Sequence, residues 1–312
     1  RAASGRRSCG RTMPVMAQLR EVRQQIQSIG KTRQITSAMQ RIAFIRMGRA
    51  QQRARQLRPY SDALLHIVAR VLAQQADYVS PLMAQREPRR IGLIVVATDK
   101  GLCGALNQRL LQLAVSRQAV WQQAGQHVSA TVLGARGLGT LRRAGVPIVA
   151  QATGVADLKA EDQGKLMGAV AVPLHQFIDG EIDELHIASN HFVNTLRYEP
   201  TLMRVLPFSR SLAALPPLTG DEAGIDFLYE PSPHQVIDAL LLRYVETAIY
   251  RAIVENAACE QSARMTAMKA ATDNADQLIA DLTRSFHKLR QEAITRELTE
   301  IIGGAAAVQE PT

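Results

Sequence analysis

The chain has 312 residues and a formal net charge of +9, and its composition excludes several classes of protein. Apolar residues make up 46% of it, which provides for a sizeable core and argues against wholesale disorder. The longest strongly apolar stretch, residues 91–97, has only the length of a strand, so no transmembrane helix is expected. Three widely spaced cysteines without a CxxC pair argue against a disulfide framework or a structural zinc site.

The positive charge is concentrated near the N-terminus. Residues 1–60 contain 14 Lys or Arg and one acid, Glu21, for a net charge of +13, whereas the remainder has a net charge of −4. Such a basic segment fits nucleic acid, anionic lipid or an acidic protein partner. Because aromatic residues are only 4% of the chain, a base-stacking platform is disfavoured.

Residues 1–15 form a segment with its own composition. Four arginines stand among Ser and Thr without an acid, and Pro14 ends the run. This composition is typical of a targeting peptide. Upstream translated sequence or a vector-derived remnant is the simpler interpretation, with Met13 or Met16 as the true start.

Residues 16–80 are expected to form a long N-terminal coiled-coil helix, with its helical pattern running from about Ala17 to Ala76. Apolar residues recur at alternating spacings of three and four on either side of a break near Gly30: Leu19, Val22, Ile26 and Ile29, then Ile35, Ala38, Ile42 and Ile45. A stripe this narrow indicates a coiled-coil seam. Pro59 is expected to kink or interrupt the helix.

Residues 90–207 are expected to form an α/β domain. Strand patterns at 91–97, 128–133, 147–151 and 184–188 alternate with helical patterns at 105–124 and 162–177. This alternation predicts a largely parallel sheet with flanking helices. Residues 208–233 contain four prolines and are expected to be a linker.

Residues 234–308 predict a second coiled-coil helix. Neither Gly nor Pro occurs from His234 to Ile302, and a helix of that length spans roughly 100 Å, more than one globular core. Its seam is assigned to Met265, Met268, Thr272, Ala275, Ile279, Leu282, Phe286, Leu289 and Ala293. The N-terminal segment is the only other helix of suitable length, so the two ends are expected to pair, with the α/β domain inserted between them. A coiled coil that dimerises two copies of the chain is the alternative.

Residues that could perform chemistry give only weak signals. Gly101 and Gly104 lie between a strand and a helix, and a second glycine-rich turn spans residues 134–139, but neither matches GxGxxG or GxxxxGK[ST]. Cys103 is placed at a helix N-terminus, which lowers a thiol pKa, yet without a His partner it is better interpreted as a buried packing residue. The seven histidines have no metal-ligand spacing.

Five stretches of the chain resemble one family, the gamma subunit of the F-type ATP synthase, in its bacterial, proteobacterial form. They occur in the family's order between about Met16 and Val308: residues 32–39, 99–107, 192–195, 264–274 and 290–307. The resemblance implies that the two terminal helices form an antiparallel coiled coil with an inserted Rossmann-like α/β domain. It also implies a central rotor shaft that couples proton flow to ATP synthesis or hydrolysis, without a catalytic site, cofactor or metal of its own.

The resemblance further implies the partners and the location. The partners are the alpha and beta subunits of the catalytic ring, the epsilon subunit and the membrane c-ring, with no nucleic acid and no direct membrane span. The location is peripheral, on the cytoplasmic side of the cell inner membrane, with the matrix side of the mitochondrial inner membrane as second choice.

Individual residues carry over at a limited number of positions. Partner contacts, chiefly with the beta subunit, are implied for Met39, Glu260, Arg264, Gln291, Thr295 and Glu297. Seam positions are assigned to Ile35, Ile42, Ile45, Met268, Ala275, Ile279, Leu282, Phe286 and Leu289. Residues 42–47 depart from the family pattern because Phe44 and Ile45 are bulkier than usual, so packing or partner fit is expected to differ there.

Two alternative functions remain open on the sequence alone. A nucleotide-binding α/β enzyme predicts that the isolated chain binds nucleotides. A basic coiled-coil protein that binds nucleic acid predicts DNA binding with a steep dependence on salt.

Overall fold

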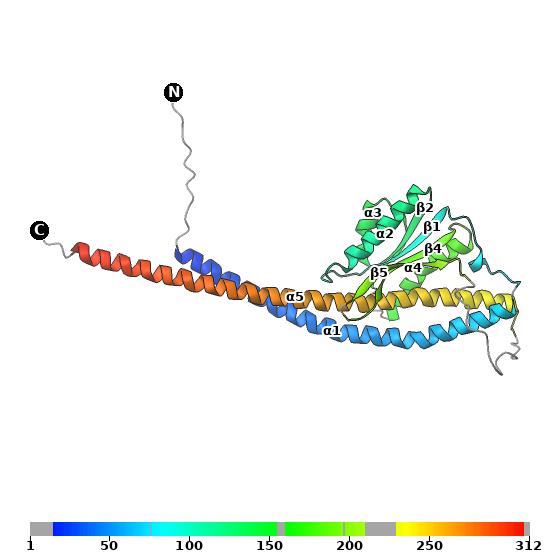
Figure 1. Cartoon of the computed structure of the whole chain (residues 1–312), viewed down its shortest axis with the longest axis horizontal. Coiled ribbons are helices and arrows are strands. Elements are labelled where there is room, and N and C mark those ends of the chain that lie inside the picture. Colours follow the sequence, from blue (N-terminus) through cyan, green and yellow to red (C-terminus); the bar gives the residue numbers. More distant parts are fainter. Residues whose placement is uncertain (1–14, 76, 155–159, 196, 210–228, 309–312) are drawn as a thin grey trace, which may run out of the picture. The chain divides into compact units, whose positions relative to one another are not determined.

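The computed structural model describes residues 15–75, 77–154, 160–195, 197–209 and 229–308. The predicted extension at 1–15 therefore lies outside the described residues, except for Val15. Residues 210–228 of the predicted linker also lie outside them. Two long helices, α1 (Val15–Gln74) and α5 (Pro233–Val308), run through two compact units (Figure 1). We call residues up to 40 with residues from 268 onward the coiled-coil unit, and residues 41–267 the α/β unit.

The coiled-coil unit is an antiparallel pair of helices, as the sequence predicts. The hydroxyl oxygens of Thr36 in α1 and Thr272 in α5 lie 2.7 Å apart. One turn earlier in α1, Nε of Arg33 lies 2.5 Å from a carboxylate oxygen of Asp276, which is one turn later in α5. On α5 the assigned seam residues are shielded to different degrees: Met268 and Ala275 are buried, and Ile279, Leu282, Phe286 and Leu289 are half-buried.

The predicted α1 seam is wrong after Gly30. Ile35, Ile42 and Ile45 are 60%, 51% and 56% exposed, whereas Thr36 and Ala43 are buried. The stripe of shielded residues that contains Val22, Ile26 and Ile29 is interrupted at the exposed residues 31–35 and resumes at positions 36, 43 and 47. The sequence interpretation assigned the large apolar side chains to the seam, but the small residues Thr36 and Ala43 are the buried ones. Small side chains allow the helices to approach closely, and the isoleucines are left exposed to solvent.

The α/β unit contains one five-stranded sheet in the order β3-β2-β1-β4-β5. Strands β1 (Arg90–Val96), β2 (His127–Leu133), β3 (Ile148–Ala152) and β4 (Glu184–Phe192) are parallel. The sequence did not predict β5 (Tyr198–Leu206), which is antiparallel to β4 and forms one edge of the sheet. Pro200 and the charged residues of β5 obscure its strand pattern and suit an edge strand.

Helices cover both faces of this sheet (Figure 1). Side chains along β1 alternate between two cores: Leu93 and Val95 pack with α2 (Leu106–Gln123) and α3 (Ala135–Arg143). Ile94 and Val96 pack with η1 (Pro81–Met83), α4 (Ala160–Ile178) and the α/β-unit segments of α1 and α5. A strand that is buried on both faces explains the continuous apolar run in the sequence.

Two local predictions need correction. The glycine-rich stretch at 134–139 is mostly helix α3 and not a turn, although Gly134 itself has a φ of +94°. A Cβ at Gly134 would lie 2.4 Å from the carbonyl oxygen of Ala97, so only glycine fits there. Pro59 does not interrupt α1, which is helical from Val15 to Gln74. In the part of the chain that the structure describes, no helix is both long and apolar enough to cross a membrane.

Candidate interaction surface

The end of α5 presents apolar side chains to solvent. Among the residues of α5 up to 304, Ala293 is the last half-buried one, and every residue from 294 to 304 is exposed. Four large apolar side chains lie in this stretch, each 46–67% exposed: Ile294, Leu298, Ile301 and Ile302. We call residues 294–304 the α5 tip. These four residues are at positions i, i+4, i+7 and i+8 of the helix, so they line one face of the α5 tip, which is typical of a helix face that a partner covers.

A second exposed apolar patch lies on α1. Within the α/β unit, Ile42, Phe44 and Ile45 are 51%, 61% and 56% exposed. Arg41, Arg46 and Arg49 are interspersed with them along the helix and are also exposed. The residues that depart from the family pattern are therefore on the surface, where they affect the fit to a partner more than the packing of this chain.

The predicted partner-contact residues of the coiled-coil unit are accessible. Met39 is half-exposed on α1, and Gln291, Thr295 and Glu297 are exposed on α5. Gln291 and Thr295 are one helical turn apart and share a face. Their accessibility permits partner contact, which remains a prediction for these four residues.

Glu260 and Arg264 were predicted to contact a partner, but they are inside the α/β unit. Their residues are 2% and 8% exposed, and Nη2 of Arg264 lies 2.6 Å from Oε1 of Glu260. The same nitrogen donates a hydrogen bond to the carbonyl oxygen of Gly101, at 3.1 Å. From the sequence one can see that Glu260 and Arg264 are one helical turn apart. The sequence does not reveal that the loop after β1 packs over this pair and buries it.

That loop, residues 98–105, follows the carboxyl end of β1, where many α/β proteins bind a phosphate. Here the carboxylate of Asp99 accepts hydrogen bonds from the backbone N–H groups of Ala135, at the start of α3, and of Gly154. Cys103 packs against Cys259 and other small residues of α5. The chain thus supplies its own anion at the α3 N-terminus and covers the loop with its own helix.

Neither buried cysteine is an activated nucleophile. Burial raises the pKa of Cys103, and this outweighs the opposing effects of a hydrogen bond with Thr98 and the charge of Arg264. The expected lowering by a helix N-terminus is therefore wrong. Burial also raises the pKa of Cys259, whose thiol donates to the carbonyl oxygen of Asn190. Both thiols stay protonated at neutral pH, when a thiol reacts slowly.

Comparison with known proteins decides the family. The ATP synthase family model matches residues 18–308. The ATP synthase gamma chain of Dechloromonas aromatica is 43% identical over 294 residues, which cover 93% of this chain and 99% of that one. The gamma chain of Thiobacillus denitrificans is 41% identical over 298 residues, covering 94% and 100%. This chain belongs to the ATP synthase gamma-chain family.

Solved structures agree with this at the level of the fold. A chain from the Euglena gracilis mitochondrial ATP synthase covers 94% of this chain and 95% of its own length, with a TM-score of 0.60 and 17% identity. A chain from the central stalk and c-ring of the Tetrahymena thermophila mitochondrial enzyme covers 76% and 99%, with a TM-score of 0.55 and 21% identity. As a gamma chain, the protein is a subunit of ATP synthase that has no catalytic site of its own.

Sequence reasoning missed the α5 tip as a functional surface. The available signal was the end of the regular seam at Ala293, after which Ile294, Leu298, Ile301 and Ile302 form a stripe that is displaced around the helix from the seam. The earlier heptads drew attention to the helix pair, whereas the displaced stripe at the end of α5 is the part that exposes apolar surface.

Proposed function

We propose that this chain is the central rotor shaft of an F-type ATP synthase, and that it couples proton flow through the membrane ring to ATP synthesis and hydrolysis at the alpha/beta ring. The observation that carries the proposal is the α5 tip of a gamma-family chain. Four large apolar side chains that are exposed along one face of a helix end are typical of a surface that a partner covers. A ring of subunits around the α5 tip provides that partner.

The two exposed surfaces suit different tasks in a rotating shaft. Apolar contact depends less on angle than a hydrogen bond does, so the apolar stripe of the α5 tip can turn against an apolar surface of the surrounding ring. Charge-assisted hydrogen bonds depend on distance and angle, so the polar residues Arg41, Gln291 and Glu297 meet a partner differently at each angle. Coupling requires such differential contacts. A shaft that bound every conformational state of the catalytic subunits equally would not change the populations of these states.

The finer assignments follow from family membership. The alpha and beta subunits contact the coiled-coil unit at Met39, Gln291, Thr295 and Glu297, and the c-ring and the epsilon subunit contact the α/β unit. The complex lies peripherally on the cytoplasmic side of the cell inner membrane. Cofactors and nucleic acid have no part in this function.

The α5 tip gives a direct test of the proposal. A tagged chain should co-purify with the alpha and beta subunits, and the double substitution Ile301→Asp and Ile302→Asp should reduce the recovered subunits or the coupling of hydrolysis to proton pumping. The matched control is Lys288→Gln at an exposed position of α5 that precedes the tip, which should leave both unchanged. Full recovery and full coupling in the aspartate variant would contradict the role of the α5 tip.

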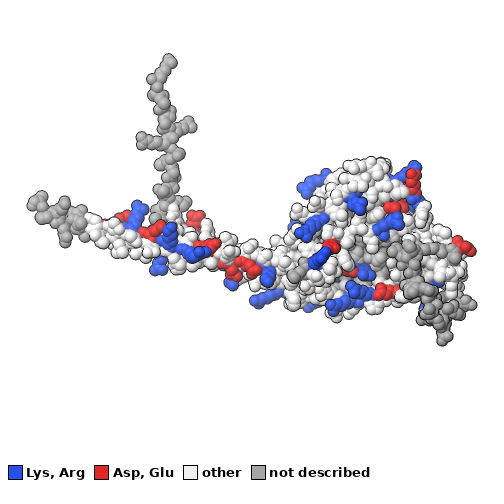
Figure 2. All heavy atoms as spheres, viewed as in Figure 1, with Lys and Arg blue, Asp and Glu red and all other residues white. Residues whose placement is uncertain are grey.

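The alternative functions make opposite predictions. The nucleotide-binding enzyme predicts saturable ATP or NAD binding by the isolated chain; we expect none in the millimolar range, because Asp99 and α5 occupy the end of β1. The nucleic-acid protein requires a basic surface. On the face that Figure 2 shows, acidic side chains are interspersed with the basic ones along the coiled-coil unit, which disfavours that function.

A further inference from the structure

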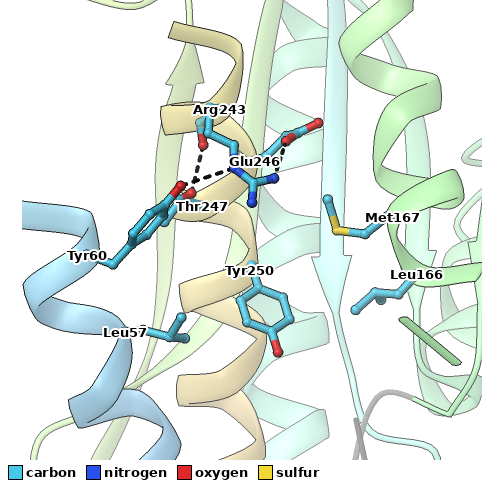
Figure 3. A pocket seen from close by; sticks show the side chains of 8 residues that line it. All are labelled: Leu57, Tyr60, Leu166, Met167, Arg243, Glu246, Thr247 and Tyr250. Atoms are coloured by element: carbon cyan, nitrogen blue, oxygen red, sulfur yellow. Dashed lines mark hydrogen bonds and ion pairs between the residues drawn. The ribbon is translucent and has the colours of Figure 1, made fainter. Parts of the chain in front are cut away.

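A cavity of about 310 Å³ lies within the α/β unit, between α1, α4 and α5 (Figure 3). Its apolar wall comes from Leu57 of α1 and from Leu166 and Met167 of α4. Figure 3 shows the two α4 side chains on the opposite side of the cavity from Arg243 and Tyr250 of α5. The coiled-coil seam, the α5 tip and the loop after β1 do not include any of these residues, so the proposed function leaves the cavity without a role.

A guanidinium group is fixed at the polar wall. Nε of Arg243 donates to the hydroxyl oxygen of Tyr60, at 3.2 Å, and Nη1 donates to a carboxylate oxygen of Glu246, also at 3.2 Å. Thr247 donates its hydroxyl to the backbone carbonyl of Arg243, one turn earlier in the helix. Two partners from different helices therefore orient the guanidinium plane, so a ligand meets a group whose position is already set.

Most of the free groups at this wall are donors. Among the described residues, Nη2 of Arg243 and the hydroxyl of Tyr250 have no hydrogen-bond partner, and the hydroxyl of Tyr60 still has its own hydrogen to donate. Glu246 receives Nη1 of Arg243 on one of its two carboxylate oxygens, so it is partly occupied as an acceptor. Unused donors beside apolar side chains match a ligand that joins an acceptor group to an apolar body.

We propose that this cavity binds a small amphiphilic carboxylic acid. The carboxylate accepts from Nη2 of Arg243 and from the phenol of Tyr250, as a charge-assisted pair, and the apolar body lies against Leu57, Leu166 and Met167. A cavity of about 310 Å³ is at the lower end of the range for ligand sites, which limits the body to roughly a dozen heavy atoms. The ligand contacts three helices of one unit, so its binding stabilises that unit.

The test uses 4-phenylbutyrate as the probe and the purified full-length chain. Calorimetric titration should give one saturable site with a dissociation constant of about 0.1–10 mM. The neutral 4-phenylbutyramide and the cationic 4-phenylbutylamine should each bind at least tenfold more weakly. Saturating probe should also raise the melting temperature of the chain.

Three variants separate the site from general charge attraction. Arg243→Gln should weaken binding of the acid tenfold or more, and Tyr250→Phe should weaken it by a smaller factor while preserving the fold. The matched control is Arg58→Gln, which removes an exposed arginine from a neighbouring groove on α1 and should leave the affinity unchanged. Far-ultraviolet circular dichroism confirms that each variant is folded.

Three results would overturn the proposal. One is the absence of saturable binding up to the solubility limit of the probe. Another is equal binding of acid, amide and amine, or tightest binding of the amine, which would make Glu246 the recognition group. The third is unchanged affinity in both Arg243→Gln and Tyr250→Phe. None of these outcomes bears on the rotor function, which is tested by subunit recovery and coupling.

Discussion

Replacing Arg264 by methionine tests the buried ion pair that joins α5 to the loop after β1. The side chains of Arg264 and Glu260 are 10% and 2% exposed, and Arg264 also donates to the carbonyl oxygen of Gly101. Methionine keeps an unbranched apolar stem but removes the charge and both hydrogen bonds. Glu260 is then left as a buried carboxylate without its cation.

The expected cost follows from this burial. Removing one member of a buried pair destabilises a protein by about 3–5 kcal/mol, because the remaining charge stays desolvated. For a unit of this size, each kcal/mol lowers the melting temperature by about 2–4 °C, which gives a decrease of roughly 6–20 °C. Replacing both members, with Glu260→Leu added to Arg264→Met, should recover most of the loss because no unpaired charge remains.

Urea and thermal unfolding of the purified chain measure the effect. The matched control is Arg296→Met, whose partner Glu300 is also one turn away but whose pair is 72% and 70% exposed. An exposed pair of this kind contributes at most about 0.5 kcal/mol, so the control should be close to the parent chain. A loss below about 1 kcal/mol in Arg264→Met, or a double variant less stable than the single one, would refute the reasoning.

Three further predictions concern other parts of the chain. Cysteines replacing Thr36 and Thr272 should form a disulfide within one chain under mild oxidation, because their hydroxyl oxygens lie 2.7 Å apart; exclusively intermolecular products on a non-reducing gel would contradict this. Met39→Lys should lower proton pumping per ATP more than ATP hydrolysis in membrane vesicles, because an added ion pair of about 1–3 kcal/mol at some rotary angles creates a barrier; proportional loss of both would indicate misassembly instead. Burial alone would raise the pKa of Asp183, but hydrogen bonds from Arg90 and from two backbone N–H groups lower it below the ordinary value of 3.8. The stabilisation by Asp183 is therefore present above that value and is lost as the pH falls through the lowered pKa, so Asp183→Asn should flatten the acid side of the stability curve, and an unchanged curve would contradict this.

The large elements could be predicted because their patterns are long. α1 and α5 extend over many turns, and β1 to β4 are apolar runs bounded by turn residues, so each gives a clear signal. α3 is short and starts with glycines, and β5 contains Pro200 and charged residues, so neither has the pattern of its class. Context in the folded chain decides such segments, and a single sequence does not contain that context.

The interaction surfaces were harder to predict for a different reason. A helical pattern gives the spacing of a stripe but not which stripe faces the partner when large side chains occur on more than one face. Thr36 and Ala43 are small and inside, whereas Ile35 and Ile42 are large and outside, so size misled the assignment. Glu260 and Arg264 were misplaced because burial depends on residues far away in the sequence.

The cavity beside Arg243 could not have been predicted from the sequence. Tyr60, Met167 and Arg243 come from three different helices, Tyr60 and Arg243 are 183 residues apart along the chain, and no motif links them. Only the packing of α1, α4 and α5 brings these side chains together, and it does so within the α/β unit.

The most direct test of the rotor function is to observe rotation. A single reactive cysteine at Ser116, an exposed position on α2, should be labelled with a bead in a chain that carries Cys9→Ser, because Cys103 and Cys259 are buried. With the alpha/beta ring immobilised, we expect the bead to turn in one direction when ATP is added and to stop when ATP is removed. ATP hydrolysis by fully assembled complexes whose beads stay still would contradict the rotor function.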